Sequence, residues 1–106
     1  MVLKVSSQDF SAQVLQSHQP VLVDFYAAWC GPCKLMEPIL EEAEKERSDL
    51  RIAKVNVDEE PGLAQKHKVG SVPTLVLYYQ GQIKATWQGL RTKKVLLNDI
   101  AAALKI

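Results

Sequence analysis

Apolar and polar positions along the chain form the patterns of short strands and amphipathic helices. Residues 21–26, Val-Leu-Val-Asp-Phe-Tyr, are almost continuously apolar, which predicts a strand buried on both faces. Strands are also predicted over residues 51–57, 74–79 and 82–88. The last two are spaced as an antiparallel hairpin around a Gln-Gly pair, although this pair is a weaker turn signal than Asn-Gly.

Helical spacing of apolar residues predicts the helices. The longest covers residues 33–47, where Met36, Ile39, Leu40 and Ala43 recur along one face. The remaining predicted elements are a strand over residues 2–5, a helix capped by Ser6 or Ser7 and ending near residue 17, a short helix over residues 61–66, and a final helix over residues 92–104.

The order of these elements predicts the fold class. Residues 21–26, 33–47 and 51–57 form a βαβ unit, whose two strands run parallel. All the elements together fit an α/β fold, in which a central mixed sheet of about five strands carries helices on both faces. The 106 residues are close to the commonest domain size and contain no repeat or linker, so we expect one domain over residues 1–106.

Composition and charge argue against several classes of function. Apolar residues make up 47% of the chain and charged residues 24%, which is an ordinary globular composition. The net charge of +1 argues against nucleic acid or an anionic membrane as the main partner. The first residues lack the apolar run of a signal peptide, and no stretch approaches the roughly 18 apolar residues of a membrane span. We therefore expect a cytoplasmic protein, although a mature organellar form would look the same.

The two cysteines, Cys30 and Cys33, carry the most informative signal. The loop between them is too short to restrict the unfolded chain much, so a structural disulfide explains the pair poorly. In a reducing cytosol such a pair is typical of a catalytic or metal-binding site. Against zinc, there is no second Cys-x-x-Cys, and His18 and His67 lack the spacing of a ligand pair. Inert buried thiols are the remaining alternative.

The position of the pair favours redox chemistry. Trp-Cys-Gly-Pro-Cys-Lys, residues 29–34, connects the strand 21–26 to the helix 33–47. A helix N-terminus offers unpaired N–H groups and about half a positive charge, both of which stabilise a thiolate. Cys30 precedes the helix and can face solvent, whereas Cys33 is helical and turns inward. We therefore expect Cys30 to be the nucleophile and Cys33 the resolving thiol.

Two charged residues lie inside predicted strands. Asp24 is in the doubly buried strand, where an acid is costly unless it is paired or protonated. Either Asp24 reaches solvent or caps a turn near the strand end, or its pKa is raised and it exchanges a proton with Cys33. Lys54 lies in the neighbouring strand, where a solvated strand face is the simpler interpretation.

Several further segments accompany the cysteine motif. These are Val-Asp-Phe-Tyr-Ala-Ala at residues 23–28, Ala-Lys-Val-Asn-Val-Asp at 53–58, Ser-Val-Pro-Thr at 71–74, and Gly89. Together with the motif they resemble the thioredoxin family along the whole chain, which implies the thioredoxin fold. A bare Cys-x-x-Cys would be a weak signal, but matching segments in the same order make a strong one.

The resemblance implies further site residues. Pro73 would be a cis-proline that faces the cysteines, although most X–Pro bonds are trans. Val72 would offer its backbone groups to an extended substrate segment. Asp24 would be the proton shuttle of Cys33, with Lys54 as its charge neighbour. The implied substrate-docking surface is flat and apolar, and it comprises Trp29, Gly31, Pro32, Val72, Pro73 and Gly89.

The resemblance also implies the reaction and its partners. The chain would reduce protein disulfides by dithiol–disulfide exchange, and a thioredoxin reductase would restore the cysteines. We expect a monomer with no bound cofactor beyond the redox-active Cys30–Cys33 disulfide. A disulfide oxidant or isomerase on the same fold is the nearest rival, but the Gly-Pro pair between the cysteines resembles the reducing members. A binding module that docks a partner without redox turnover is the alternative from another class.

This chain departs from the family pattern close to the motif. Tyr26 stands where many thioredoxins carry a second tryptophan, Ala28 replaces a frequent acidic residue, and Gly70 replaces a larger, often basic one. These changes leave the chemistry intact and bear on partner preference. Trp87 has no implied role, and we expect it to pack against one face of the sheet.

Overall fold

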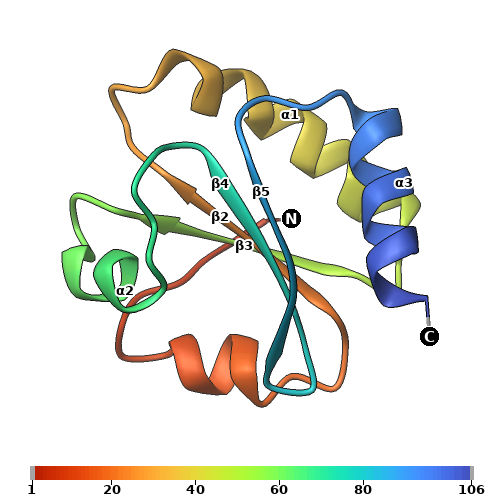
Figure 1. Ribbon diagram of the computed structural model, residues 1–106, viewed down its shortest axis with the longest axis horizontal. Helices are drawn as coiled ribbons and strands as arrows, with labels where there is room; N and C mark the ends of the chain where they lie inside the picture. The colour runs from red at the N-terminus through yellow and green to blue at the C-terminus, as the bar shows by residue number, and fades with distance from the viewer. Residues whose placement is uncertain (1, 106) are drawn as a thin grey trace.

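Five strands form one mixed sheet in the computed structural model, which describes residues 2–105 (Figure 1). The strands are β1 (Leu3–Lys4), β2 (Val21–Tyr26), β3 (Arg51–Asn56), β4 (Thr74–Tyr79) and β5 (Gln82–Gln88). Their order across the sheet is β1-β3-β2-β4-β5, so that β2 lies at the centre. β1, β3 and β2 are parallel, whereas β4 is antiparallel to both β2 and β5. The predicted fold class is therefore confirmed.

Helices cover both faces of this sheet. Within residues 2–105 they are the short π-helix η1 (Ser11–Leu15) and the α-helices α1 (Gly31–Glu46), α2 (Pro61–Lys66) and α3 (Lys93–Leu104). One core cluster joins the sheet to α1 and α3, and a second joins it to η1 and α2. Figure 1 shows the two pairs of helices on opposite sides of the strands.

The central strand β2 contributes side chains to both clusters in alternation. Val21, Val23 and Phe25 belong to the cluster on the side of η1 and α2, and Leu22 belongs to the cluster on the side of α1 and α3. Burying a leucine side chain such as Leu22 stabilises the fold by about 1.5–3 kcal/mol. Asp24 is the next residue on the α1 and α3 side, because successive side chains of a strand point to opposite faces. A carboxyl group therefore occupies a position that packing alone would give to an apolar residue.

The predicted hairpin and parallel unit are both present. β2 pairs with β3 from Val21 opposite Arg51 through to Tyr26 opposite Asn56. Gln80 and Gly81 connect β4 to β5, and their φ values of 55° and 78° are both positive. A type I′ hairpin turn requires positive φ at both positions, which explains how a Gln-Gly pair serves here.

The first predicted helix is wrong in extent. Only Ser11–Leu15 forms a helical segment, rather than the stretch from Ser6 or Ser7 to residue 17. Asp9 Oδ1 accepts hydrogen bonds from both the backbone N–H and the hydroxyl of Ser6, at 2.8 and 3.2 Å. These bonds are those of a capping box, and the Ser6 carbonyl oxygen accepts the N–H of Phe10 at 3.0 Å, so Ser6 caps a turn at residues 7–9 that leads into the helical segment.

Gly89 has a backbone conformation that favours glycine. Its φ is +87°, and its N–H donates a 2.9 Å hydrogen bond to the Pro73 carbonyl oxygen. Gly89→Ala is expected to lower the free energy of unfolding in urea by about 1–2 kcal/mol, because L-residues are strained in this region. Gly62→Ala, inside α2 where an added Cβ meets nothing within 4 Å, is the control and should instead raise stability by up to about 1 kcal/mol. Equal effects of the two substitutions would contradict a conformational role for Gly89.

Candidate active site

Cys30 and Cys33 form a disulfide at the N-terminus of α1. Their Cα atoms are 5.3 Å apart. Cys30 is the N-cap of the helix, and its Sγ accepts a 3.2 Å hydrogen bond from the backbone N–H of Cys33. Gly31 and Pro32 are the first helical residues, a position where proline costs little because its missing N–H would be unpaired anyway. The helix therefore begins earlier than the predicted residue 33.

Burial does not separate the two sulfurs as predicted. Cys30 is 4% exposed and Cys33 is 2% exposed, so the expectation that Cys30 faces solvent is wrong for the disulfide form. Apolar neighbours, among them Ala27, Val57 and Val72, pack around both cysteines and cover them. The two residues differ instead in their place on the helix, because Cys30 caps it and Cys33 lies inside its first turn.

The loop before β4 packs against the cysteines through Val72. The Val72–Pro73 peptide bond is cis, as predicted. Pro73 itself is buried, which corrects the expectation that it forms part of an exposed docking surface. Its carbonyl oxygen accepts the N–H of Gly89, which joins the loop before β4 to the residue that follows β5. Thr74 stabilises the same loop, because its hydroxyl donates a 2.7 Å hydrogen bond to the Ser71 carbonyl oxygen.

Trp29 is the most exposed large apolar side chain beside the disulfide, with 72% of its surface accessible. Its indole Nε1 donates a 2.9 Å hydrogen bond to Oδ2 of Asp58, which fixes the ring although it is exposed. Asp58 is in turn held by the side chain of Asn56, whose Oδ1 accepts the Asp58 N–H at 2.9 Å. Asp58 belongs to a segment that matches the family, but the sequence pattern did not assign it to the site. Its position two residues after β3, on the same edge of the sheet as the cysteines, was the signal that could have found it.

A shallow cavity of about 170 Å³ adjoins the exposed tryptophan. It brings together two predicted docking residues and the loop before β4. Its lining residues are Trp29, Val57, Val69, Gly70, Ser71 and Val72. Gly31 and Pro32 are also exposed at the start of α1.

Asp24 lies in the middle of the sheet, with Lys54 of β3 and Leu75 of β4 as its register partners. It is only 2% exposed, and within residues 2–105 no donor reaches its Oδ1 atom. Burial, followed by the negative charge of Glu37, raises its pKa from 3.8 to about 7, while the positive charge of Lys54 acts in the opposite direction. Asp24 is therefore the carboxyl with a raised pKa that one of the two sequence interpretations proposed.

Lys54 is half-buried on its strand face. Its ammonium lies 5.7 Å from the centroid of the Tyr26 ring. It also lines the same cavity as Asp24, a space of about 320 Å³ between α1, β2 and β3. Lys54 is thus a charge neighbour of Asp24, as the resemblance implied.

Comparisons with known proteins agree with this geometry. A protein-family model described as Thioredoxin matches residues 1–102 of the chain. The chain belongs to the thioredoxin family. It is a thiol–disulfide oxidoreductase of that family, with Cys30 and Cys33 as its redox pair.

Individual relatives cover most of the chain. A protein named Thioredoxin from Acidithiobacillus ferridurans is 47% identical over 96 residues, which are 90% of this chain and 89% of that protein. One of the same name from Mycobacterium bovis is 45% identical over 100 residues, or 93% of this chain and 86% of the relative. A bifunctional thioredoxin reductase/thioredoxin from Mycobacterium leprae is 43% identical over 102 residues. That match covers 95% of this chain, which spans 22% of the bifunctional protein.

The departures from the thioredoxin pattern lie on or near the surface of the site. The ring of Tyr26 lies under the ammonium of Lys54. Ala28 is exposed next to Trp29 in the sequence, and Gly70 lines the shallow cavity. Trp87 packs against the core cluster under α1 and α3, with Arg91 5.8 Å from its ring centroid. The expectation of a packing role for Trp87 is therefore confirmed.

Within residues 2–105, no three His, Cys, Asp or Glu side chains gather in a group that could hold a metal ion. A search of the same residues for a helix long and apolar enough to span a membrane found none.

Proposed function

We propose that this protein reduces disulfide bonds in other proteins, with Cys30 as the nucleophile and Cys33 as the resolving thiol. The observation that carries this proposal is the position of Cys30 as the N-cap of α1, where its Sγ accepts the N–H of Cys33. In the reduced protein, that N–H and the helix dipole would stabilise a thiolate on Cys30. The thiolate is the form of cysteine that attacks disulfides.

The exchange proceeds in two steps. The Cys30 thiolate attacks one sulfur of the substrate disulfide, forms a mixed disulfide with it, and releases the other substrate sulfur as a thiolate. Cys33 loses its proton and attacks the Cys30 sulfur, which forms the Cys30–Cys33 disulfide and releases the second substrate thiolate. Two electrons pass from the cysteine pair to the substrate, and the two thiol protons pass to the products.

Asp24 is proposed to accept the proton of Cys33 in the second step. A general base works best when its pKa lies near the operating pH, and the pKa of Asp24 is raised to about 7. Its carboxyl group lies on the face of the sheet that α1 covers, and Cys33 lies in the first turn of that helix. Lys54 moderates the effect of burial, because its positive charge favours the ionised form of Asp24.

The substrate is proposed to dock across the exposed rim of the disulfide. Trp29, Gly31, Pro32 and Val72 supply this apolar rim. Pro73 and Gly89 support it from the adjoining loop through their backbone hydrogen bond. An extended substrate segment would pair with the backbone of Val72, which packs directly on the cysteines.

A thioredoxin reductase is the proposed partner that returns the Cys30–Cys33 disulfide to the dithiol. The bifunctional relative from Mycobacterium leprae, whose name joins a thioredoxin reductase to a thioredoxin, supports this assignment. The protein would act in the cytoplasm as a monomeric, single-domain electron carrier in redox homeostasis. It would need no bound cofactor and no nucleic-acid or membrane partner.

The test is the reduction potential of the Cys30–Cys33 couple, measured by equilibration in glutathione or dithiothreitol buffers. We expect a value near −270 mV, the general reference value for thioredoxin itself. A value above about −200 mV would make the protein an oxidant or isomerase and would contradict the proposed direction.

A variant with Cys30→Ser and Cys33→Ser together is the control. It should lose all disulfide reduction and keep the fold, because both side chains are replaced by groups of similar size. If the biological phenotype survived in this variant, a docking role without redox turnover would explain the protein better.

A further inference from the structure

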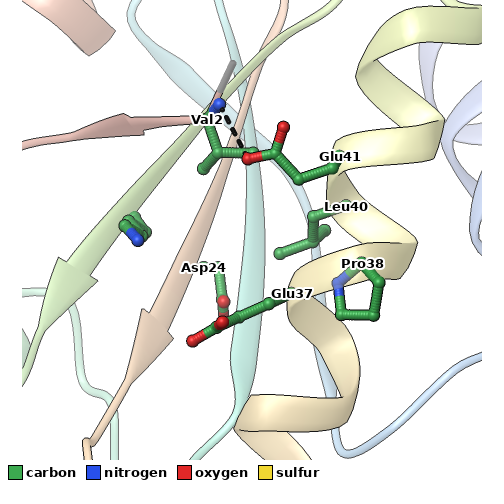
Figure 2. A pocket seen from close by; sticks show the side chains of 7 residues that line it. Val2, Asp24, Glu37, Pro38, Leu40 and Glu41 are labelled. Carbon is green, nitrogen blue, oxygen red and sulfur yellow. Dashed lines mark hydrogen bonds between the residues drawn. The ribbon is translucent and has the colours of Figure 1, made fainter.

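The cavity of about 320 Å³ next to Asp24 gathers charged groups from three elements. Asp24 comes from β2, Lys54 from β3, and Glu37 and Glu41 from α1. Figure 2 shows this space between the strands and the helix. These four residues are the titratable groups that line the cavity, so they decide how readily Asp24 holds a proton.

The two glutamates differ in what they face. Glu41 Oε1 accepts a 3.3 Å hydrogen bond from the backbone N–H of Val2, and its carboxylate points toward that residue (Figure 2). Glu37 instead lines the cavity together with Asp24 and acts on it by its charge, and the two carboxylates overlap in the same view. Within residues 2–105, no hydrogen-bond donor reaches Oδ1 of Asp24. The ionisation of this oxygen therefore depends on the neighbouring charges rather than on a hydrogen bond.

Glu37 lies on the same helix as the resolving cysteine, Cys33. It follows Cys33 by four residues in α1, and side chains at this spacing lie on the same side of a helix. α1 therefore presents Cys33 and, one turn later, Glu37 to the same part of the sheet. A charge at position 37 acts on the group that is proposed to exchange a proton with Cys33.

We propose that Glu37 is a positioning residue that sets the proton affinity of Asp24, and thereby the pH at which Cys33 resolves the mixed disulfide. The inference rests on the proposed role of Asp24 as the base in that step. Glu37 touches neither the substrate nor the disulfide in this mechanism and acts through Asp24 alone.

The direction of the effect follows from the signs of the charges. A solvent-exposed glutamate is negatively charged near neutral pH, and a second negative charge beside it is disfavoured. Glu37 therefore favours the protonated form of Asp24, in the same direction as burial, and Lys54 favours the ionised form. The balance leaves the pKa of Asp24 at about 7, where it can take a proton from Cys33 during reduction and return it when the dithiol is regenerated.

The experiment compares Glu37→Gln with Glu41→Gln, which removes the same charge from the same wall of the cavity. The Asp24 carboxyl is titrated by carbon-13 NMR, and the rate of mixed-disulfide resolution is measured against pH by stopped flow. In Glu37→Gln we expect the pKa of Asp24 to fall by about half a unit to one unit. This would raise the ionised fraction of Asp24 at pH 6 about 2.5- to 5.5-fold and move the acid limb of the rate profile to lower pH by the same half unit to one unit.

Two comparisons sharpen the result. Glu41→Gln should move the Asp24 titration much less, because its carboxylate is turned toward Val2. Lys54→Gln should move the titration in the opposite direction, to higher pH. Added salt should shrink the difference in the pKa of Asp24 between Glu37→Gln and the parent, because salt screens the exposed charge of Glu37.

Each failure has its own meaning. An unchanged Asp24 titration in Glu37→Gln, or an equal shift in Glu41→Gln, would overturn the inference. If the titration moved while the rate profile stayed in place, Asp24 would not be the base, and both its proposed role and the inference would fall. Disulfide reduction through Cys30 and Cys33 would survive either result, since the reduction potential tests it separately.

Discussion

Cys33→Ser is expected to turn the protein from a catalyst into a trap for its substrates. The Cys30 thiolate still attacks a substrate disulfide, but the serine hydroxyl cannot displace the substrate sulfur, so the mixed disulfide persists. Turnover should fall to the background rate, and one substrate should be held for each protein molecule. Mass spectrometry under non-reducing conditions measures the trapped species, and dithiothreitol should release it.

Cys30→Ser is the matched control for this experiment. It removes the N-cap sulfur and should capture little or no substrate, because the remaining thiol of Cys33 lies inside the first turn of α1. Both cysteines are almost fully buried in the disulfide form, so exposure alone does not decide which one attacks. Equal trapping by the two variants would show that the nucleophile is wrongly assigned.

Asp24→Asn is expected to stabilise the protein strongly at alkaline pH. Folding raises the pKa of Asp24 from 3.8 to about 7, so the folded protein binds more protons than the unfolded chain between these values. The free energy of unfolding therefore falls as the pH rises through this window. At about 1.4 kcal/mol for each pKa unit, the variant should be more stable than the parent by about 4 kcal/mol above pH 7.

The stabilisation should depend on pH in a way that identifies its cause. It should shrink as the pH falls, be small at pH 4, and disappear only below about pH 3, where the Asp24 carboxyl is protonated in both states. Asp49→Asn is the control, because Arg47 lowers the pKa of this exposed carboxyl through a hydrogen bond and its loss should be slightly destabilising. Urea unfolding at pH 4, 6 and 8 measures both variants. A gain for Asp24→Asn that is the same at every pH would point to packing rather than to the buried charge.

Local patterns predicted the strands well because they depend on burial along a short stretch. The apolar run in β2 is buried as expected, since β3 and β4 flank it and helices cover both of its faces. The first helix is shorter than predicted, because residues 7–9 form a turn that hydrophobic periodicity does not distinguish from a helix. The start of α1 was predicted too late. Cys30 is the N-cap of this helix, so the helix already begins at Gly31.

The site was predicted in part. Cys30, Cys33 and Asp24 were found because their chemistry is unusual at their positions in the sequence. Asp58 and Glu37 were missed, because an acidic residue in a loop or on a helix surface is ordinary until its partner is known. The hydrogen bond from Trp29 to Asp58 spans 29 positions of the chain.

Three features could be predicted from the amino-acid sequence alone: the α/β class, the redox pair at the start of a helix, and a costly acid in a buried strand. These features rest on periodicity, on spacing and on the cost of burying charge, all of which act locally. Three features became visible only in the folded protein: both cysteines are buried, Asp24 shares a cavity with Glu37 and Lys54, and Pro73 is buried. Electrostatic energies depend on distance and solvent exposure in three dimensions, so the environment of Asp24 emerged only once α1, β2 and β3 were brought together.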